Sequence, residues 1–197
     1  MDNAPSIVPL DAVRSRLSLD ELCDLVDCCR PGGAVLDVGC GDGAFVRELR
    51  AGGYDAFGID DATTAASCTA GDPAAAVPLD AASIGLAIIR GTQTFGRGVG
   101  SPEAVVGLAN VLATIRGGGR VAIAVDETGA DAVLTHFGLH VESVVAAEPI
   151  GLIGRLLGRR PRGPQVLVGV VPAKPLSKLE YHAIARDLAM ATLQRAA

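Results

Sequence analysis

The stretch that most constrains this chain spans residues 34–60, AVLDVGCGDGAFVRELRAGGYDAFGID. A short apolar run reaches Asp37 and is followed by a turn with three glycines, Gly39, Gly41 and Gly43. Residues 44–51 then have a helical composition, and a second apolar run ends at Asp60. The order strand, glycine loop, helix, strand is typical of a parallel sheet and predicts an α/β fold.

The chemistry of this loop indicates a nucleoside-containing ligand. Glycines allow positive φ angles and let the backbone approach a ligand closely. The loop opens onto the start of a helix, where free N–H groups favour anionic groups. An acid at the end of the next strand, here Asp60, can accept both hydroxyls of a ribose.

The loop fits two cofactor templates. As G-x-G-x-x-A, from Gly39 to Ala44, it could hold the pyrophosphate of a dinucleotide. As D-x-G-x-G-x-G, starting at Asp37, it resembles motif I of the class I S-adenosylmethionine (SAM) dependent methyltransferases. Asp37 and Asp42 would repel a pyrophosphate, whereas the ammonium and sulfonium of SAM suit neighbouring acids. These two acids favour the SAM interpretation.

A second segment extends the resemblance and also departs from it. Residues 71–89 are similar to the family pattern G-D-A-x-x-L-P-x-x-D-x-S-F-D-L-V. The resemblance implies that Asp72 accepts a hydrogen bond from the adenine amino group, a task that suits a carboxylate. The alternative is a turn residue before Pro73. The aromatic and acid of the pattern are replaced by Ile84 and Gly85.

The resemblance assigns roles around the carboxyl ends of the strands, where α/β sheets bind ligands. Asp37 would orient the amino-acid end of SAM through the glycine loop or water, Asp60 would hold the ribose and Asp72 the adenine. Arg90, Thr92 and Gln93 would lie near the methyl donor. The residues assigned to cofactor binding are Asp37, Gly39, Cys40, Gly41, Gly43, Asp60, Asp61, Asp72 and Arg90.

No catalytic residue is assigned, because no general base is evident in the loop that follows residues 84–89. In-line displacement from a sulfonium can proceed by positioning alone when the acceptor is already nucleophilic. No metal site is expected either. The cysteines at 23, 28 and 29 crowd one predicted helix without a C-x-x-C spacing or a nearby histidine, so apolar packing is their expected role.

The first predicted helix begins after Ser18, with Glu21 completing a capping box. Its apolar face is expected to contain Leu19, Leu22, Val26 and Cys29, and its role is interpreted as packing rather than as a cover for the cofactor. The final helix begins at Ser177, again with a glutamate three residues on. It can dock on its own sheet or on a second copy of the chain, as in a homodimer.

Between these helices the elements are expected to alternate. They are a small-residue helix over 62–69, a strand over 84–89, a helix capped by Ser101 with Val105, Leu108, Leu112 and Ile115 on its buried face, a glycine turn over 116–120, a strand over 121–125, a short helix within 126–138, and strands over 139–146 and 165–171. The resemblance implies a doubly wound, mostly parallel, seven-stranded sheet whose last strand lies antiparallel between the fifth and sixth.

Length and composition favour one domain over 1–197, with an N-terminal leader and helix (1–30), a core (31–172) and a C-terminal helix (173–197). The net charge of −5 does not support broad nucleic-acid binding. No run approaches the ~18–20 apolar residues of a membrane span. The first residues lack the features of a signal peptide, and an odd cysteine number, five, indicates a reducing cytoplasm.

These observations predict a cytoplasmic, SAM-dependent methyltransferase acting on a small molecule. Three alternatives remain open. One is a degenerate relative that binds SAM or S-adenosylhomocysteine without turnover in a regulatory or assembly role, suggested by Gly85 and the loop without histidine. Another is a nicotinamide-dependent reductase, which the acids around the loop disfavour. The third acts on a lipid-like acceptor through the basic and apolar residues 150–162, whose plainer interpretation is a solvated insertion.

Overall fold

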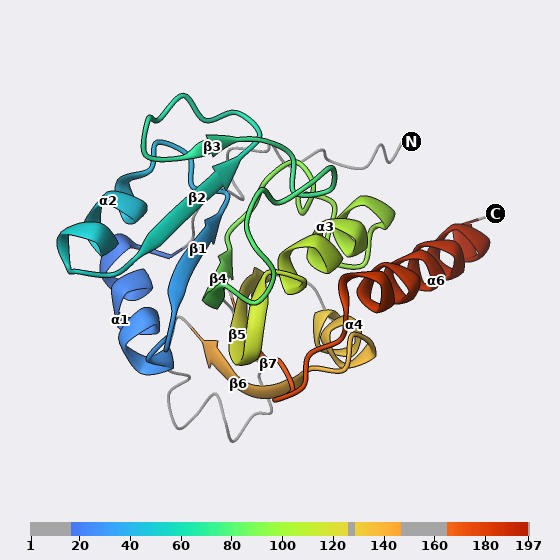
Figure 1. The fold of residues 1–197 in the computed structure, drawn as a ribbon. Helices are drawn as coiled ribbons and strands as arrows, with labels where there is room; N and C mark the ends of the chain where they lie inside the picture. Colours follow the sequence, from blue (N-terminus) through green and yellow to red (C-terminus); the bar gives the residue numbers. More distant parts are fainter. Residues whose placement is uncertain (1–16, 126–128, 147–164, 197) are drawn as a thin grey trace, which may run out of the picture.

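The computed structural model describes residues 17–125, 129–146 and 165–196, which form a sheet with helices on both faces (Figure 1). The strands are β1 (Ala34–Val38), β2 (Ala56–Asp60), β3 (Thr69–Ala70), β4 (Ile84–Ile89), β5 (Ile115–Val125), β6 (His140–Ala146) and β7 (Gln165–Val170). The helices are α1 (Leu19–Cys29), α2 (Ala44–Ala51), α3 (Pro102–Leu112), α4 (Ala130–His136) and α6 (Lys178–Ala196).

The seven strands lie in the order β3-β2-β1-β4-β5-β7-β6. Neighbouring strands from β3 to β5 are parallel, whereas β7 runs antiparallel to both β5 and β6. The predicted mostly parallel sheet, with its last strand between the fifth and sixth, is therefore confirmed. The strand order reverses between β1 and β4, and ligands of open α/β sheets bind at such a switch point.

Two apolar clusters cover the two faces of the sheet. One joins α1 and α2 to the sheet, and the other joins it to α3, α4 and α6. All five residues of β1 are buried, as expected for a central strand with helices on both sides. In α1 the buried residues are Leu22, Leu25, Val26 and Cys29. The expected place of Leu19 on this face is wrong, because its position in the first turn leaves it 39% exposed.

The helix starts follow the local signals of the sequence. Ser18 Oγ accepts a hydrogen bond from the Glu21 backbone N–H (3.3 Å), and the Glu21 carboxylate accepts one from the Ser18 N–H (2.7 Å). Ser177 and Glu180 repeat this arrangement at the start of α6. Ser101 caps α3, which has proline at its first position. All three predicted caps are confirmed.

The predicted helix over 62–69 is wrong. This segment forms irregular turns that end in the short edge strand β3. The Thr63 hydroxyl donates to the Gly41 carbonyl (2.6 Å) and accepts from the Ala65 N–H (3.1 Å). Side-chain bonds of this kind compete with helical backbone bonds. A tertiary contact with the glycine loop therefore replaces the helix.

The predicted start of the fifth strand is also wrong. β5 begins at Ile115 rather than at 121, so the glycines of the expected turn lie within an irregular first part of the strand. The Thr114 carbonyl accepts from the Ile84 N–H (3.0 Å), which brings the chain beside β4 as soon as α3 has ended. The register then shifts between Ile84 and Leu86. The four predicted apolar residues of this region are nevertheless all buried.

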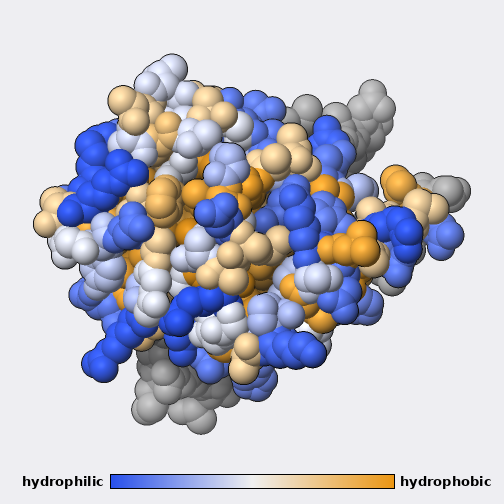
Figure 2. All heavy atoms as spheres, in the orientation of Figure 1, coloured by the Kyte–Doolittle hydropathy of each residue, from blue (hydrophilic) through white to orange (hydrophobic). Residues whose placement is uncertain are grey.

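The final helix packs on α3 of the same chain, and the two lie side by side in Figure 1. Tyr181 is fully buried there, with its ring centroid 6.3 Å from that of Phe137. Over α6, hydrophilic and hydrophobic residues are interspersed on the face seen in Figure 2. Residues 150–162 lie outside the described residues. In the described part of the chain, no helix combines the length and apolar character needed to cross a membrane.

Candidate cofactor site

A cavity of about 310 Å³ opens at the switch point, beyond the ends of β1, β2 and β4. The sequence-predicted residues that line it are Gly39, Cys40, Gly41, Asp60 and Arg90, and those that do not are Asp37, Gly43, Asp61 and Asp72. Phe45 also lines it, as do four residues at the start of α1: Leu17, Ser18, Leu19 and Leu22. Neither contribution was predicted from the sequence, although a helix in front of the glycine loop was a signal for the second.

Two positions of the loop require glycine for different physical reasons. Gly39 has a φ of +89°, and a Cβ at this position would lie 2.7 Å from the Gly91 carbonyl oxygen. The loops after β1 and β4 therefore touch backbone to backbone. Gly41 has a φ of +55°, and a Cβ there would meet no atom within 4 Å. Because Gly41 lines the cavity, its missing side chain leaves room for a ligand rather than for the protein.

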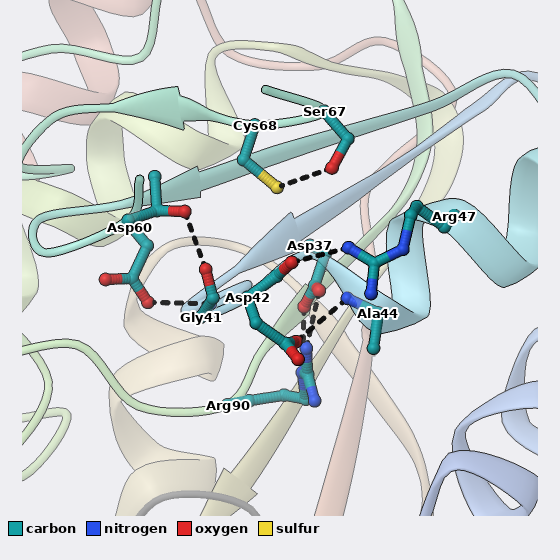
Figure 3. A network of polar contacts seen from close by, with 10 residues as sticks. Asp37, Gly41, Asp42, Ala44, Arg47, Asp60, Ser67, Cys68 and Arg90 are labelled. Carbon is teal, nitrogen blue, oxygen red and sulfur yellow. Dashed lines mark hydrogen bonds and ion pairs between the residues drawn. The ribbon is translucent and has the colours of Figure 1, made fainter. Parts of the chain in front are cut away.

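Asp60 holds the glycine loop in place from the end of β2. Its carboxylate accepts a hydrogen bond from the backbone N–H of Gly41 (3.0 Å), as Figure 3 shows, and another from the N–H of Ala62 (2.9 Å). Asp60 is only 2% exposed. Each carboxylate oxygen can accept more than one hydrogen bond. Asp60 can therefore position the loop and still accept from a ligand hydroxyl in the cavity.

The other two predicted nucleoside-binding acids hold the loop after β4. The Gln93 backbone N–H donates to one oxygen of Asp61 (3.2 Å), and the Thr94 hydroxyl donates to Oδ1 of Asp72 (2.5 Å). Asp72 Oδ1 also accepts from the Ala74 N–H (2.8 Å). The structure thus connects Asp61 and Asp72 through this loop, next to the cavity rather than on its wall.

Two polar atoms beside the loops after β2 and β4 are buried and unpaired. The second oxygen of Asp61, Oδ1, and the hydroxyl of Thr92 are buried without a hydrogen-bond partner among the described residues. A buried polar atom left unpaired costs about 1–3 kcal/mol, so such atoms call for an explanation. The open position at Gly41 and the Asp60 carboxylate, both on the cavity wall, make the residues present suitable for a polar ligand such as a nucleoside.

Asp37 and Arg90 form a buried ion pair. Arg90 donates from Nε to Oδ1 of Asp37 (2.8 Å) and from Nη2 to Oδ2 (2.5 Å), as Figure 3 shows. Burial raises the pKa of the Asp37 carboxyl, and the charge of Arg90 opposes that shift. The guanidinium carbon also lies 5.4 Å from the centre of the Phe45 ring. Arg90 lines the cavity, and Asp37 lies behind it.

The thiol of Cys40 contacts the segment that follows β2. The sulfurs of Cys40 and Cys68 both lie close to Gly58, where a Cβ would be 2.9 and 2.6 Å from them. Burial, followed by the neighbouring thiol of Cys68, raises the pKa of Cys40 well above its usual value. Cys40 therefore remains a protonated thiol at neutral pH, and the thiolate is the reactive form.

We expect iodoacetamide at neutral pH to label the exposed Cys28 first and to leave Cys40 unlabelled until the protein is unfolded. The raised pKa and the burial of Cys40 act in the same direction. Mass spectrometry of peptides after timed labelling, with and without urea, measures this order. Equal labelling of the two cysteines in the folded protein would show that the loop opens freely.

No metal site was expected from the sequence, including at the cysteines of α1. Among the residues that the structure describes, no group of three or more histidine, cysteine, aspartate or glutamate side chains could hold a metal ion. The cysteines of α1 do not form such a group: Cys29 is buried and Cys28 exposed.

No protein-family model matches the chain, and no curated protein sequence matches it. Solved structures do. The protein is similar to the 1,6-didemethyltoxoflavin-N1-methyltransferase of Burkholderia thailandensis, solved with its substrate and S-adenosylhomocysteine (TM-score 0.57, 14% identity, 76% of each chain). It is also similar to a TehB-like SAM-dependent methyltransferase from Corynebacterium glutamicum (TM-score 0.54, 21% identity, 81% of this chain and 91% of that one).

A third similar structure is the magnesium protoporphyrin IX methyltransferase of Synechocystis with bound SAM (TM-score 0.54, 13% identity, 77% of this chain and 78% of that one). The fold of this protein is therefore that of the class I SAM-dependent methyltransferases. Identities of 13–21% define the fold and not the reaction.

Proposed function

We propose that this protein binds SAM at the switch point and transfers its methyl group to a small-molecule acceptor. The observation that carries the proposal is the bond between Asp60 and the Gly41 N–H, which holds the glycine loop open beside the cavity. A loop of this shape suits close approach of a nucleoside cofactor to the backbone. The similar methyltransferases that carry SAM or S-adenosylhomocysteine support the same ligand.

The proposed roles follow from the acceptors that remain. Asp60 lines the cavity and would accept from the ribose hydroxyls, and the unpaired Oδ1 of Asp61 would supply a further acceptor. Oδ2 of Asp72 has no hydrogen-bond partner among the described residues and would accept from the adenine amino group. SAM, when bound, supplies a methyl group on a positively charged sulfur.

The contribution of the chain to the chemistry is positioning. Residues 90–100 after β4, RGTQTFGRGVG, contain no histidine, aspartate or glutamate that could act as a general base. Holding an acceptor in line with a reactive group can by itself supply much of a rate enhancement. The proposed acceptor is therefore a small molecule whose attacking atom is nucleophilic without help from the protein.

We expect calorimetric titration to detect binding of SAM and S-adenosylhomocysteine, and no binding of NADH. Asp60→Ala should weaken S-adenosylhomocysteine binding about 10- to 100-fold, because it removes charged acceptors and frees the Gly41 N–H. Asp55→Ala is the matched control, since Asp55 is an exposed acid at the opposite end of β2.

The outcomes separate the candidate functions. Binding of NADH with no binding of SAM would replace the proposal by a reductase. Binding of SAM without methyl transfer to any of a panel of small amines, phenols, thiols and carboxylates would favour the degenerate, non-catalytic relative. A folded protein that binds none of these cofactors would reject the proposal.

A further inference from the structure

Arg90 has hydrogen-bond donors that Asp37 does not engage. A guanidinium has five N–H donors in a planar fork. The Asp37 carboxylate engages one on Nε and one on Nη2. Three donors remain, two on Nη1 and one on Nη2, and one N–H of each nitrogen forms the free Nη1–Nη2 edge of the guanidinium.

This free edge is accessible from the cavity. Arg90 lines the cavity, and its side chain retains 12% of its exposure. Nη1 has no hydrogen-bond partner among the described residues. One flat side of the guanidinium is against Phe45, which restricts its rotation.

The charges around the pair define what the free edge can bind. Asp37 is fully buried, and both of its oxygens are engaged by Arg90, so an ammonium group in the cavity has no direct access to that carboxylate. The group presented to the cavity is instead a cation with parallel N–H donors. Such a fork matches the geometry of a carboxylate, and a planar bidentate contact is stronger than an ordinary hydrogen bond.

We propose that Arg90 binds the α-carboxylate at the amino-acid end of the cofactor, and that Asp37 and Phe45 are positioning residues that hold the guanidinium. This inference rests on the proposed function and deepens it: the site selects adenosyl ligands that retain the carboxylate. It also gives Asp37 an indirect role, in place of contact with the ammonium.

The first test uses the unaltered protein and three ligands. S-Adenosylhomocysteine carries both the amine and the carboxylate, its decarboxylated analogue keeps only the amine, and 5′-methylthioadenosine lacks both. We expect calorimetry to show that the decarboxylated analogue binds about 10- to 100-fold more weakly than S-adenosylhomocysteine. We expect 5′-methylthioadenosine to bind about as weakly as the analogue.

The second test assigns the difference to Arg90. Arg90→Met should weaken S-adenosylhomocysteine by about the same factor and leave the affinity for the decarboxylated analogue nearly unchanged. Because this variant leaves Asp37 buried without its partner, the titrations are repeated in Asp37→Asn/Arg90→Met. Arg120→Met is the matched control: Arg120 lies on β5, away from the cavity, and pairs with Glu142 (3.6 Å).

The outcomes distinguish this inference from the function on which it rests. Equal affinity for S-adenosylhomocysteine and its decarboxylated analogue overturns the inference and leaves SAM binding intact. Equal affinity for the two ligands is also expected if Arg90 binds a carboxylate of the acceptor, since no acceptor is present in these titrations. If the folded protein binds none of the three ligands, the proposed function fails first.

Discussion

Replacing Asp37 with alanine is expected to lower the free energy of unfolding by about 3–5 kcal/mol, the cost of removing one partner of a buried ion pair. The substitution removes the carboxylate that engages the Arg90 guanidinium twice, and the Arg90 side chain is only 12% exposed. Arginine does not lose its proton in proteins, so the charge cannot neutralise itself. Urea unfolding followed by circular dichroism measures the loss.

The matched variants are Arg90→Met and the double substitution Asp37→Ala/Arg90→Met. Because the double variant has no unpaired charge, it should be more stable than Asp37→Ala, and its cost should be less than the sum of the two single costs by about 1–3 kcal/mol. If the stability costs of the two single substitutions simply add, the two side chains do not interact in solution, and the proposed positioning role of Asp37 is contradicted.

Alanine at Gly39 is expected to affect mainly the stability of the fold, whereas alanine at Gly41 is expected to affect mainly the affinity for the cofactor. Gly39→Ala should cost about 2–5 kcal/mol of stability, from the left-handed backbone together with the contact of a new Cβ 2.7 Å from the Gly91 carbonyl oxygen. Gly41→Ala should cost only about 1–2 kcal/mol, because its Cβ meets no protein atom. That Cβ takes up ligand space, so S-adenosylhomocysteine affinity should fall by at least about tenfold.

Gly53→Ala is the control for this comparison. Gly53 has a φ of +88°, and a Cβ there also meets nothing within 4 Å, but it follows α2 and does not line the cavity. Its stability cost should match that of Gly41→Ala, and its cofactor affinity should match that of the unaltered protein. Normal affinity in Gly41→Ala would place the ligand elsewhere and would contradict the proposed site.

Much of the site could be predicted because its signals are local. The glycine spacing, the acid that ends β2 and the alternation of strands and helices all lie within short segments, and they place Gly39, Gly41 and Asp60 at the switch point. The helix caps at Ser18, Ser101 and Ser177 are local in the same sense, since each is a contact over three residues. Such patterns require no knowledge of distant neighbours.

The remainder was decided by contacts between distant segments. The Thr63 hydroxyl bonds to the Gly41 carbonyl, 22 residues away, and this bond turns a predicted helix into an irregular segment. The pair of Asp37 and Arg90 spans 53 residues, and only the reversal of strand order between β1 and β4 brings the two strand ends together.

The amino-acid sequence by itself thus determined most of the strands and helices and the glycine loop at the end of β1. By resemblance it also implied a mostly parallel seven-stranded sheet with its last strand between the fifth and sixth. Only the tertiary structure decided that Asp37 is enclosed behind Arg90 and that the first turn of α1 lines the cavity. The physical reason is that burial and charge pairing depend on which strand ends and helix ends meet in space, and short-range patterns do not contain that information.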